Sequence, residues 1–378
     1  MLIESKEMVE RTMHEVKMIV TNRFDPDVRV YKEAKYLVSC GFDVEILCWD
    51  REGEYKDKEF ENIEGIKIKR FFPYTKYGTG LKQIKPFMKF IYECRNYLNS
   101  KEYQYLHCHD LDGALVGYLC KSKKCKLIFD MHEFYEGQRN KQKIRLIIRK
   151  AVSYLQNKSD FIIYVNEAQI EHMKLKNKNK LVYLPNYAEI DNYRDCEKEK
   201  SDKLRISYIG SVRQYEELKN LMDAGKDVNN VVISIHGSGT AYTALKSIEN
   251  DYKNVNITGL YHFSKSVELY RKTDLLYVVF NTKFRNWKYG YSVKFFEAII
   301  TKTPVIVSRG SAMEEFVNKY DIGFTIDGSN IQEIKELIVY ISENRHLLDE
   351  KIKNLEKIQY EFTWERVIKN LNKIYDLH

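Results

Sequence analysis

One segment of the sequence, residues 291–308, combines a helix start with a lysine and a glutamate. Ser292 can cap this helix, where free backbone N–H groups and the helix dipole attract an anion such as a diphosphate. Lys294 and Glu297 lie three positions apart and therefore share one helical face. A lysine neutralises phosphate, and a glutamate can accept hydrogen bonds from both hydroxyl groups of a ribose. The same two residues are equally consistent with an ordinary surface ion pair.

Two loops that follow predicted strands contain small residues suited to binding phosphate. The strand at Leu204–Tyr208 leads into Gly210, and Arg213 can add a charged, forked side chain. The strand at Val231–Ile235 leads into Gly237, within the sequence His-Gly-Ser-Gly. A glycine after a strand is often only a turn, but two such loops on one sheet edge favour an anion-binding site.

Polar residues also follow two predicted strands in the first half of the chain. His107 and His109 lie on one face of a strand and Asp110 follows them, a spacing typical of metal ligands. Because no second cluster of ligands follows at a matching spacing, we predict that no metal is bound. His132 and Glu133 come at the end of another predicted strand. We expect them to line a polar site rather than to pair inside the core.

The first half of the chain carries two long basic stretches without an acidic residue. Gly65–Tyr92 holds seven basic and seven aromatic residues, and Gly137–Ser159 holds seven more basic residues. Such a surface can be an ordinary solvated face, can dock on an anionic membrane, or can follow a nucleic-acid backbone. Of the two binding interpretations we favour peripheral contact with an anionic membrane, and we expect no nucleic-acid binding.

The composition is that of a folded protein with two domains. The 378 residues are 44% hydrophobic and 31% charged, with a formal net charge of +8. No apolar run is long enough to span a bilayer, and the N-terminus lacks the apolar region of a signal peptide. We therefore expect a cytoplasmic protein, located at the inner face of the plasma membrane where lipid is bound. The seven cysteines include no Cys-x-x-Cys pair, which indicates reduced thiols.

Short β-branched segments alternate with longer amphipathic segments, the pattern of strands and helices in a parallel sheet. In the first half, helices are expected at Asp27–Ser39, from about Leu111, and at Ile144–Gln156. The strands expected there are Val16–Thr21, Val44–Cys48, Ile66–Phe71, Tyr105–His109, Lys126–Met131, Phe161–Val165 and Leu181–Leu184.

Apolar density falls and charges cluster at residues 187–203, which we interpret as a linker. The alternation then resumes and predicts a second α/β lobe of similar size. Its strands are expected at Leu204–Tyr208, Val231–Ile235, Val255–Ile257, Asp274–Phe280, Pro304–Ser308 and Gly323–Ile326. Its helices are expected at Glu217–Ala224, Thr240–Ile248, Ser264–Lys272, Val293–Thr301, Met313–Lys319 and Ile331–Glu343. We expect a cleft between the lobes, with ligands beyond the carboxyl ends of the strands.

The segment at residues 291–308 resembles the donor-binding signature of the retaining glycosyltransferases of group 1, which form family 4 of the sugar transferases and have the GT-B fold. Similar segments span nearly the whole chain: Asp27–Ala34, Gly41–Val44, Leu106–Asp110, Phe129–Glu133, Leu184–Asn186, Ile257–Gly259 and Phe362–Glu365. The resemblance implies two Rossmann-like lobes that face each other across a cleft. It implies an N-terminal domain at residues 1–186, a linker at 187–203, a C-terminal domain at 204–360, and a C-terminal helix at 361–378 that returns to the first lobe.

The resemblance also implies a division of labour. The second lobe would bind a nucleoside-diphosphate sugar, most frequently a UDP-sugar, and the first lobe would bind the acceptor. No metal or other cofactor is implied, because backbone amides and basic side chains stabilise the leaving diphosphate. The catalytic residues would be His132 and Glu297. The donor would contact Gly210, Arg213, Gly237, Asn281, Tyr291, Ser292, Val293, Lys294 and Glu297. The acceptor would contact Asn22, Arg29, His109, Asp110 and Glu133.

The chain departs from the family pattern at two places. Many members carry a second glutamate eight residues before the ribose-binding one, and here that position is Tyr289. Contacts to the sugar hydroxyls would then come from Asn281, Tyr291 and the backbone near Gly290. The loop at residues 22–25 also lacks the pair of glycines that many members use.

Three functions remain open at this point. The first is a retaining glycosyltransferase that moves a hexose to a glycan or lipid-linked glycan, in the synthesis of cell-envelope polysaccharide or glycoconjugate. The second is a nucleotide-sugar epimerase on the same fold, which needs no acceptor. The third is a non-catalytic subunit that has kept the fold, and Tyr289 is the residue that favours it.

Overall fold

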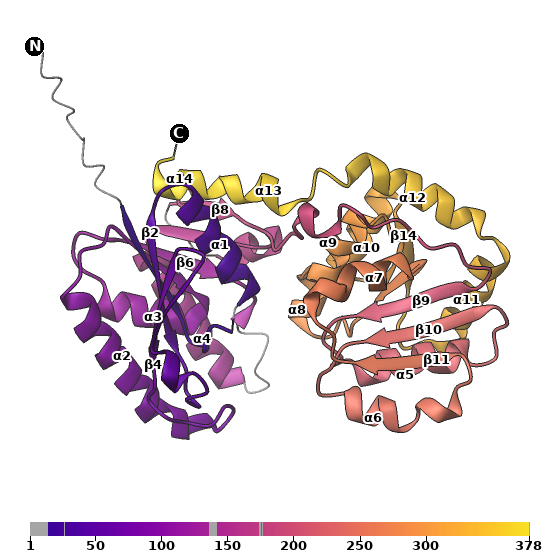
Figure 1. Ribbon diagram of the computed structural model, residues 1–378, viewed down its shortest axis with the longest axis horizontal. Helices are drawn as coiled ribbons and strands as arrows, with labels where there is room; N and C mark the ends of the chain where they lie inside the picture. The colour runs from indigo at the N-terminus through magenta and orange to yellow at the C-terminus, as the bar shows by residue number, and fades with distance from the viewer. Residues whose placement is uncertain (1–13, 26, 136–141, 174, 176, 378) are drawn as a thin grey trace, which may run out of the picture. The chain divides into compact units, whose positions relative to one another are not determined.

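The computed structural model describes residues 14–377 except residue 26, residues 136–141, and residues 174 and 176. The chain forms two compact units, which we describe separately (Figure 1). Unit 1 is Met1–Leu184 together with Asn370–His378, and unit 2 is Pro185–Lys369.

Unit 1 is built on an eight-stranded sheet in the order β3-β4-β2-β1-β5-β6-β7-β8. Its strands are β1 (Glu15–Val20), β2 (Asp43–Trp49), β3 (Phe60–Ile63), β4 (Ile66–Phe71), β5 (Tyr105–His109), β6 (Lys126–Met131), β7 (Phe161–Tyr164) and β8 (Leu181–Tyr183). The seven predicted strands are present, each within one residue at either end. The predicted parallel sheet is confirmed, and the structure adds one strand that was not predicted, β3, which pairs antiparallel with β4 at the sheet edge. Its residues are not buried, so β3 lacks the apolar run that identifies the other strands.

Helices cover both faces of this sheet. The core on one face joins the sheet to α2 (Ile84–Asn99), α3 (Asp110–Cys120) and α4 (Gln142–Lys158). On the other face, α1 (Val28–Ser39) buries Arg29 and Glu33. Asp27 caps α1 by accepting a hydrogen bond from the backbone N–H of Val30 at 3.4 Å.

The C-terminal segment of the chain belongs to unit 1, at α14 (Asn372–Tyr375). Asn370 Nδ2 donates to the carbonyl of Tyr183 at 2.8 Å, and Lys373 Nζ donates to the carbonyl of Leu181 at 3.1 Å. The predicted returning segment, 361–378, is too long, because its first part pairs within unit 2: the N–H of Trp364 donates to the carbonyl of Ala188 at 2.9 Å.

Unit 2 is built on a wholly parallel six-stranded sheet in the order β11-β10-β9-β12-β13-β14. Its strands are β9 (Leu204–Ile209), β10 (Val231–His236), β11 (Val255–Gly259), β12 (Leu275–Val278), β13 (Val305–Ser308) and β14 (Gly323–Ile326). Each was predicted to within two residues at either end, because the buried strands of a parallel sheet are apolar throughout.

Helices of unit 2 cover both sides of this sheet (Figure 1). They are α5 (Tyr215–Gly225), α6 (Tyr242–Ser247), α7 (Ser266–Arg271), α8 (Arg285–Tyr289), α9 (Val293–Ile300), α10 (Ala312–Tyr320), α11 (Ile331–Glu343), α12 (His346–Ile358) and α13 (Trp364–Val367). Short 3₁₀ helices in the two units lie at Lys56–Lys58, Gly80–Gln83, Glu167–His172, Ile190–Tyr193, Glu249–Asp251, Phe263–Lys265 and Ile368–Leu371.

The predicted linker at residues 187–203 is instead packed into unit 2. The buried Tyr193 ring lies edge-on to Tyr270 with a centroid separation of 5.7 Å. Lys198 Nζ donates to the carbonyls of Tyr270 at 2.8 Å and Thr273 at 3.0 Å. The charged composition misled the prediction, because the Lys198 amine caps backbone carbonyls rather than facing solvent.

Candidate active-site residues

The two glycine loops of unit 2 lie against each other at the carboxyl ends of β9 and β10. The N–H of Gly210 donates to the carbonyl of His236 at 2.9 Å. Gly237 has φ +132°, and a Cβ there would lie 1.9 Å from the carbonyl oxygen of Gly210. Only glycine fits this position, because a side chain would be both strained and in collision. The loops therefore form the compact, small-residue edge that the sequence predicts.

Lys294, near the start of α9, places its amine over the first of these loops. A Cβ on Gly210 would lie 3.1 Å from Lys294 Nζ. The same Nζ lies 3.4 Å from the ring centroid of Tyr208. Removal from water lowers the pKa of Lys294 to about 7, although the charge of Glu297 acts in the opposite direction. An anion bound at this edge would restore the ammonium form.

Ser292 occupies the N-cap position of α9, but its hydroxyl does not cap the helix as predicted. The N–H of Phe295 donates to the Ser292 carbonyl at 3.0 Å. The Ser292 hydroxyl is buried and has no hydrogen-bond partner among the described residues. Val293 opens the helix and is 37% exposed. The N-terminus of α9 thus presents a buried hydroxyl that a ligand can satisfy.

Glu297 lies about one turn further along α9 and is oriented by Tyr270, which was not among the predicted site residues. The hydroxyl of Tyr270 donates to Glu297 Oε2 at 2.8 Å. Burial, and next the charge of Glu297, raise the pKa of Tyr261 to about 12, which places a second phenol near the carboxylate. A neutral donor such as Tyr270 suits a carboxylate that is to accept further hydrogen bonds from ligand hydroxyls.

The other residues predicted to bind the donor are less clearly arranged for it. Arg213 follows the first glycine loop and is exposed. Asn281 lines a hollow of about 360 Å³ that Lys283 and Arg309 also line. Tyr291 packs against Phe295 and Phe316, and its hydroxyl donates to the Ala312 carbonyl at 3.2 Å. Tyr291 therefore has a packing role that the prediction did not foresee.

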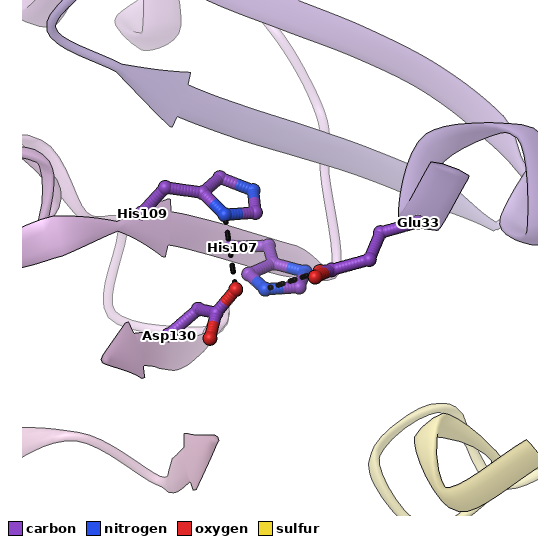
Figure 2. A group of neighbouring side chains, drawn as sticks. All are labelled: Glu33, His107, His109 and Asp130. Carbon is purple, nitrogen blue, oxygen red and sulfur yellow. Dashed lines mark hydrogen bonds and ion pairs between the residues drawn. The ribbon is translucent and has the colours of Figure 1, made fainter. Parts of the chain in front are cut away.

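In unit 1 the alternation of β5 turns its two histidines away from the main core. Leu106 and Cys108 face the core beneath α2, α3 and α4, so His107 and His109 face the side of α1. Figure 2 shows the two rings beside Glu33 of α1 and Asp130 of β6.

Asp130 lies at the centre of this buried cluster and was not among the predicted site residues. Arg29 binds it through two hydrogen bonds, Nε to Oδ2 at 3.0 Å and Nη2 to Oδ1 at 2.9 Å. His109 Nδ1 and His132 Nε2 lie 3.1 and 3.0 Å from Oδ2. Burial alone would raise the pKa of Asp130, but Arg29 and His132 hold it well below the usual range.

His132 lies between two carboxylates. Its Nε2 is 3.0 Å from Asp130 Oδ2, and its Nδ1 is 3.3 Å from Asp110 Oδ2. A neutral imidazole has one N–H, so only the imidazolium can donate to both carboxylates. Although burial opposes the charge, the two aspartates raise the pKa of His132 well above its usual range. Its side chain is 21% exposed, so the cation remains reachable from outside.

Arg29 and His109 do not face outward as the prediction that they contact the acceptor requires. They are 5% and 2% exposed, and both are turned to Asp130. Arg29 also pairs with Glu33 at 3.0 Å and donates to the Leu184 carbonyl at 3.0 Å. Through these contacts Arg29 and His109 hold the Asp130 carboxylate in place, and Asp130 in turn holds His132.

The remaining predicted acceptor residues lie around the same sheet edge. Asp110 opens α3 with φ +62°, and the hydroxyl of Tyr135 donates to its Oδ1 at 3.1 Å. Asn22 donates to Asp27 Oδ2 at 3.0 Å. Glu133 lines a small hollow of about 60 Å³ beside α4.

Glu33, His107, His109 and Asp130 offer ligand atoms that all lie within 4.8 Å of one another. These residue types bind zinc elsewhere. The guanidinium of Arg29, however, already contacts both carboxylates. A divalent cation would meet this fixed positive charge, so the residues present do not fit a metal.

The parallel sheets of the two units have the architecture of the GT-B class of glycosyltransferases. Sucrose-phosphate synthase from Thermosynechococcus elongatus superposes with a TM-score of 0.78 at 14% identity, over 96% of this chain and 98% of that chain. Anabaena Alr3699/HepE, solved in complex with UDP and glucose, gives a TM-score of 0.69 at 12% identity, over 96% and 99%.

Sequence comparison assigns the family. The profile described as "Glycosyltransferase Family 4" matches residues 27–191, and the profile described as "Glycosyl transferases group 1" matches residues 189–358. An uncharacterized glycosyltransferase of Methanocaldococcus jannaschii is 21% identical over 345 residues, 88% of this chain and 89% of the relative. The chain belongs to the group 1 glycosyltransferases.

Proposed function

We propose that this glycosyltransferase moves a hexose from a nucleoside-diphosphate sugar, bound by unit 2, to a glycan or lipid-linked glycan acceptor, bound by unit 1, with retention at the anomeric carbon. The observation that carries the donor half is the edge of unit 2 where Lys294 lies over Gly210 and Tyr270 orients Glu297. The diphosphate would meet Lys294, the glycine loop and the N-terminus of α9. The ribose hydroxyls would donate to Glu297. UDP is the expected nucleotide, and HepE is a relative of this fold solved with UDP.

In the proposed reaction the bond between the anomeric carbon and the diphosphate oxygen breaks, and the acceptor oxygen bonds to that carbon from the same face. The acceptor proton passes to the departing phosphate oxygen. Lys294 and the backbone N–H groups of α9 would stabilise the charge on the diphosphate, so we expect transfer without a metal. His132 would act through its positive charge, because its two carboxylate partners occupy both ring nitrogens and leave no free base.

Incubation of the protein with UDP-, GDP- and ADP-sugars tests this proposal against its alternatives. A transferase should release nucleoside diphosphate slowly by hydrolysis even without acceptor. An epimerase should leave the nucleotide intact and isomerise the sugar. A non-catalytic subunit should do neither, and no nucleotide should raise its melting temperature.

We also propose that unit 1 rests on an anionic membrane surface through the outer face of α2 and α4. On α2, Ile84, Met88 and Tyr92 are 56%, 55% and 65% exposed and recur every four residues, so they form one stripe. On α4, the exposed apolar residues include Ile147 at 67%. The helix α3 packs against both α2 and α4, so the two exposed faces belong to one layer.

Basic residues accompany these apolar ones, which favours an anionic bilayer as the partner. Lys85 and Lys89 flank the α2 stripe, and both are exposed. The described part of α4 carries no acidic residue. Apolar insertion and attraction to anionic lipid act together on such a surface. None of the helices in the described part of the chain has the length and apolarity needed to cross a bilayer.

Sedimentation with vesicles tests this surface. Wild type should sediment with phosphatidylglycerol vesicles, less so in high salt, and not with phosphatidylcholine vesicles. The double variant Lys85→Glu, Lys89→Glu should bind at least about tenfold more weakly, at roughly 1 kcal/mol for each basic residue. The control, Lys335→Glu with Lys353→Glu in unit 2, should bind like wild type. Equal binding by both double variants would count against the surface.

A further inference from the structure

Arg51 follows β2 at the carboxyl end of the unit 1 sheet, the edge where open parallel sheets bind ligands. His132 follows β6 on the same edge. The strand order β2-β1-β5-β6 places three strand spacings between them, about 14 Å. Neither the sequence pattern nor the proposed reaction gives Arg51 a role.

Its guanidinium is held in a fixed orientation. Its central carbon lies 4.4 Å from the ring centroid of Trp49 and 5.4 Å from that of Tyr77. Nη1 donates to Gln83 Oε1 at 3.1 Å, and Nη2 donates to the carbonyl of Thr21. The stack itself is anchored, because Trp49 Nε1 donates to the Pro73 carbonyl at 2.9 Å. A guanidinium fixed in this way has already lost the freedom that binding would cost it.

The carboxylates that neighbour Arg51 in the sequence are engaged elsewhere. Asp50 accepts from the N–H groups of Gly53 at 3.0 Å and Tyr55 at 2.8 Å. Glu52 accepts from the N–H of Tyr77 at 2.9 Å, and Glu54 pairs with Arg23. Among the described residues no ion pair joins Arg51 to a carboxylate. Burial lowers the pKa of Arg51, and the charges of Tyr77, Asp112 and Glu52 offset this effect only in part.

We propose that Arg51 binds an anionic group of the acceptor, a phosphate or a carboxylate, about 14 Å along the sheet edge from His132. Its described partners use two of the five guanidinium N–H groups, which leaves donors for a forked contact with two anionic oxygens. The inference rests on the proposed function, which assigns the acceptor to unit 1. It adds that the acceptor is acidic and that its anionic group binds to Arg51, at a distance from the reacting hydroxyl.

Calorimetric titration of the full chain tests this site with two probes, farnesyl phosphate for a lipid-linked phosphate and glucuronic acid for an acidic glycan. Wild type should bind at least one of them, and the one that binds identifies the source of the charge. Arg51→Gln should weaken that binding about tenfold or more, since a charge-assisted hydrogen bond contributes roughly 1.5–3 kcal/mol. Arg51→Lys should lie between, because it keeps the charge and loses the fork.

Arg23→Gln is the matched control, since Arg23 lies on the same edge but is paired with Asp25 and Glu54. Binding of the probe by this variant should stay within about twofold of wild type. The proposal would be overturned if wild type bound neither probe at a molar excess of about tenfold or more over the protein. It would also be overturned if Arg23→Gln weakened binding as much as Arg51→Gln does.

Titration of UDP in the same series distinguishes failure of the donor assignment from failure of the Arg51 site. If UDP does not bind wild type, the donor assignment fails. If UDP binds normally and Arg51→Gln binds the acidic probe as tightly as wild type does, only the Arg51 site is refuted.

Discussion

At the scale of single residues, the two proposed halves of the reaction depend on cations whose charge is tuned in opposite directions. Lys294 is removed from water beside an aromatic ring, which favours its neutral form. Burial also opposes the charge of His132, but this residue faces two carboxylates, which favour its charged form. Near neutral pH, Lys294 gains charge when an anion arrives and His132 carries charge before it arrives.

The binding of UDP-glucose, whose diphosphate does not titrate near neutrality, should therefore depend on the pH through Lys294. Its pKa of about 7 means that the ammonium form prevails below pH 7 and is lost above it. Affinity should be greatest near pH 6 and fall about tenfold by pH 8.5. Lys294→Met should bind weakly and equally at both pH values, which calorimetry would show. A pH dependence that survives in Lys294→Met would exclude Lys294 as its source.

Asp110→Asn should lower the pKa of His132, because one of its two carboxylate partners is lost. Activity that depends on the imidazolium should then be lost at a lower pH. The alkaline limb of the pH–rate profile should move down by about one pH unit or more. Proton NMR of the histidine resonances, alongside the pH–rate profile, would measure both shifts. An unchanged His132 titration in Asp110→Asn would contradict the account of its charge.

At the scale of elements, the C-terminal segment supports the buried cluster of unit 1. The hydroxyl of Tyr375 on α14 lies 2.9 Å from His107 Nδ1. His107 Nε2 in turn lies 3.4 Å from Glu33, which pairs with Arg29. A segment more than 250 residues away in the sequence therefore completes the network around Asp130.

Tyr375→Phe should accordingly destabilise unit 1 by about 1–3 kcal/mol, because it leaves a buried ring nitrogen without its partner. Tyr360→Phe is the control, since Tyr360 is 63% exposed. Urea unfolding of the two variants, followed by circular dichroism, would measure the difference. Equal unfolding midpoints would show that the contact with His107 contributes little.

The elements themselves were largely predictable. The strands of a parallel sheet are buried on both faces, so runs such as Val231–Ile235 stand out from the amphipathic helices. The short edge strand Phe60–Ile63 has no such run and was missed. Residues 187–203 were misread because their charge suggested a linker, whereas the Lys198 amine donates to backbone carbonyls within unit 2.

Candidate site residues could be predicted where they belong to a local sequence motif. They could not be predicted where only tertiary contacts bring them to the site. Lys294, Glu297 and His132 follow from local spacing and from the family resemblance. Asp130 and Tyr270 act through residues distant in the sequence, so no local pattern identifies them. The opposite error arose for Arg29, which the resemblance placed at the acceptor and the structure buries against Asp130.

At the scale of the whole molecule, we propose that unit 2 binds the nucleotide and unit 1 the acceptor, each at the carboxyl edge of its own sheet. The two family profiles meet at residues 189–191, near the boundary between the units at residues 184–185. The claim on which this assignment depends most is that the Glu297 carboxylate accepts the hydroxyl groups of the ribose.

Calorimetric titration of UDP and 2′-deoxy-UDP into wild type and Glu297→Gln tests that claim most directly, with Glu268→Gln on the exposed face of α7 as the control variant. Wild type and the control should prefer UDP by about tenfold or more, the contribution of one hydrogen bond to a charged acceptor. Glu297→Gln should bind both nucleotides alike. A preference for UDP that is as large in Glu297→Gln as in wild type would contradict the account.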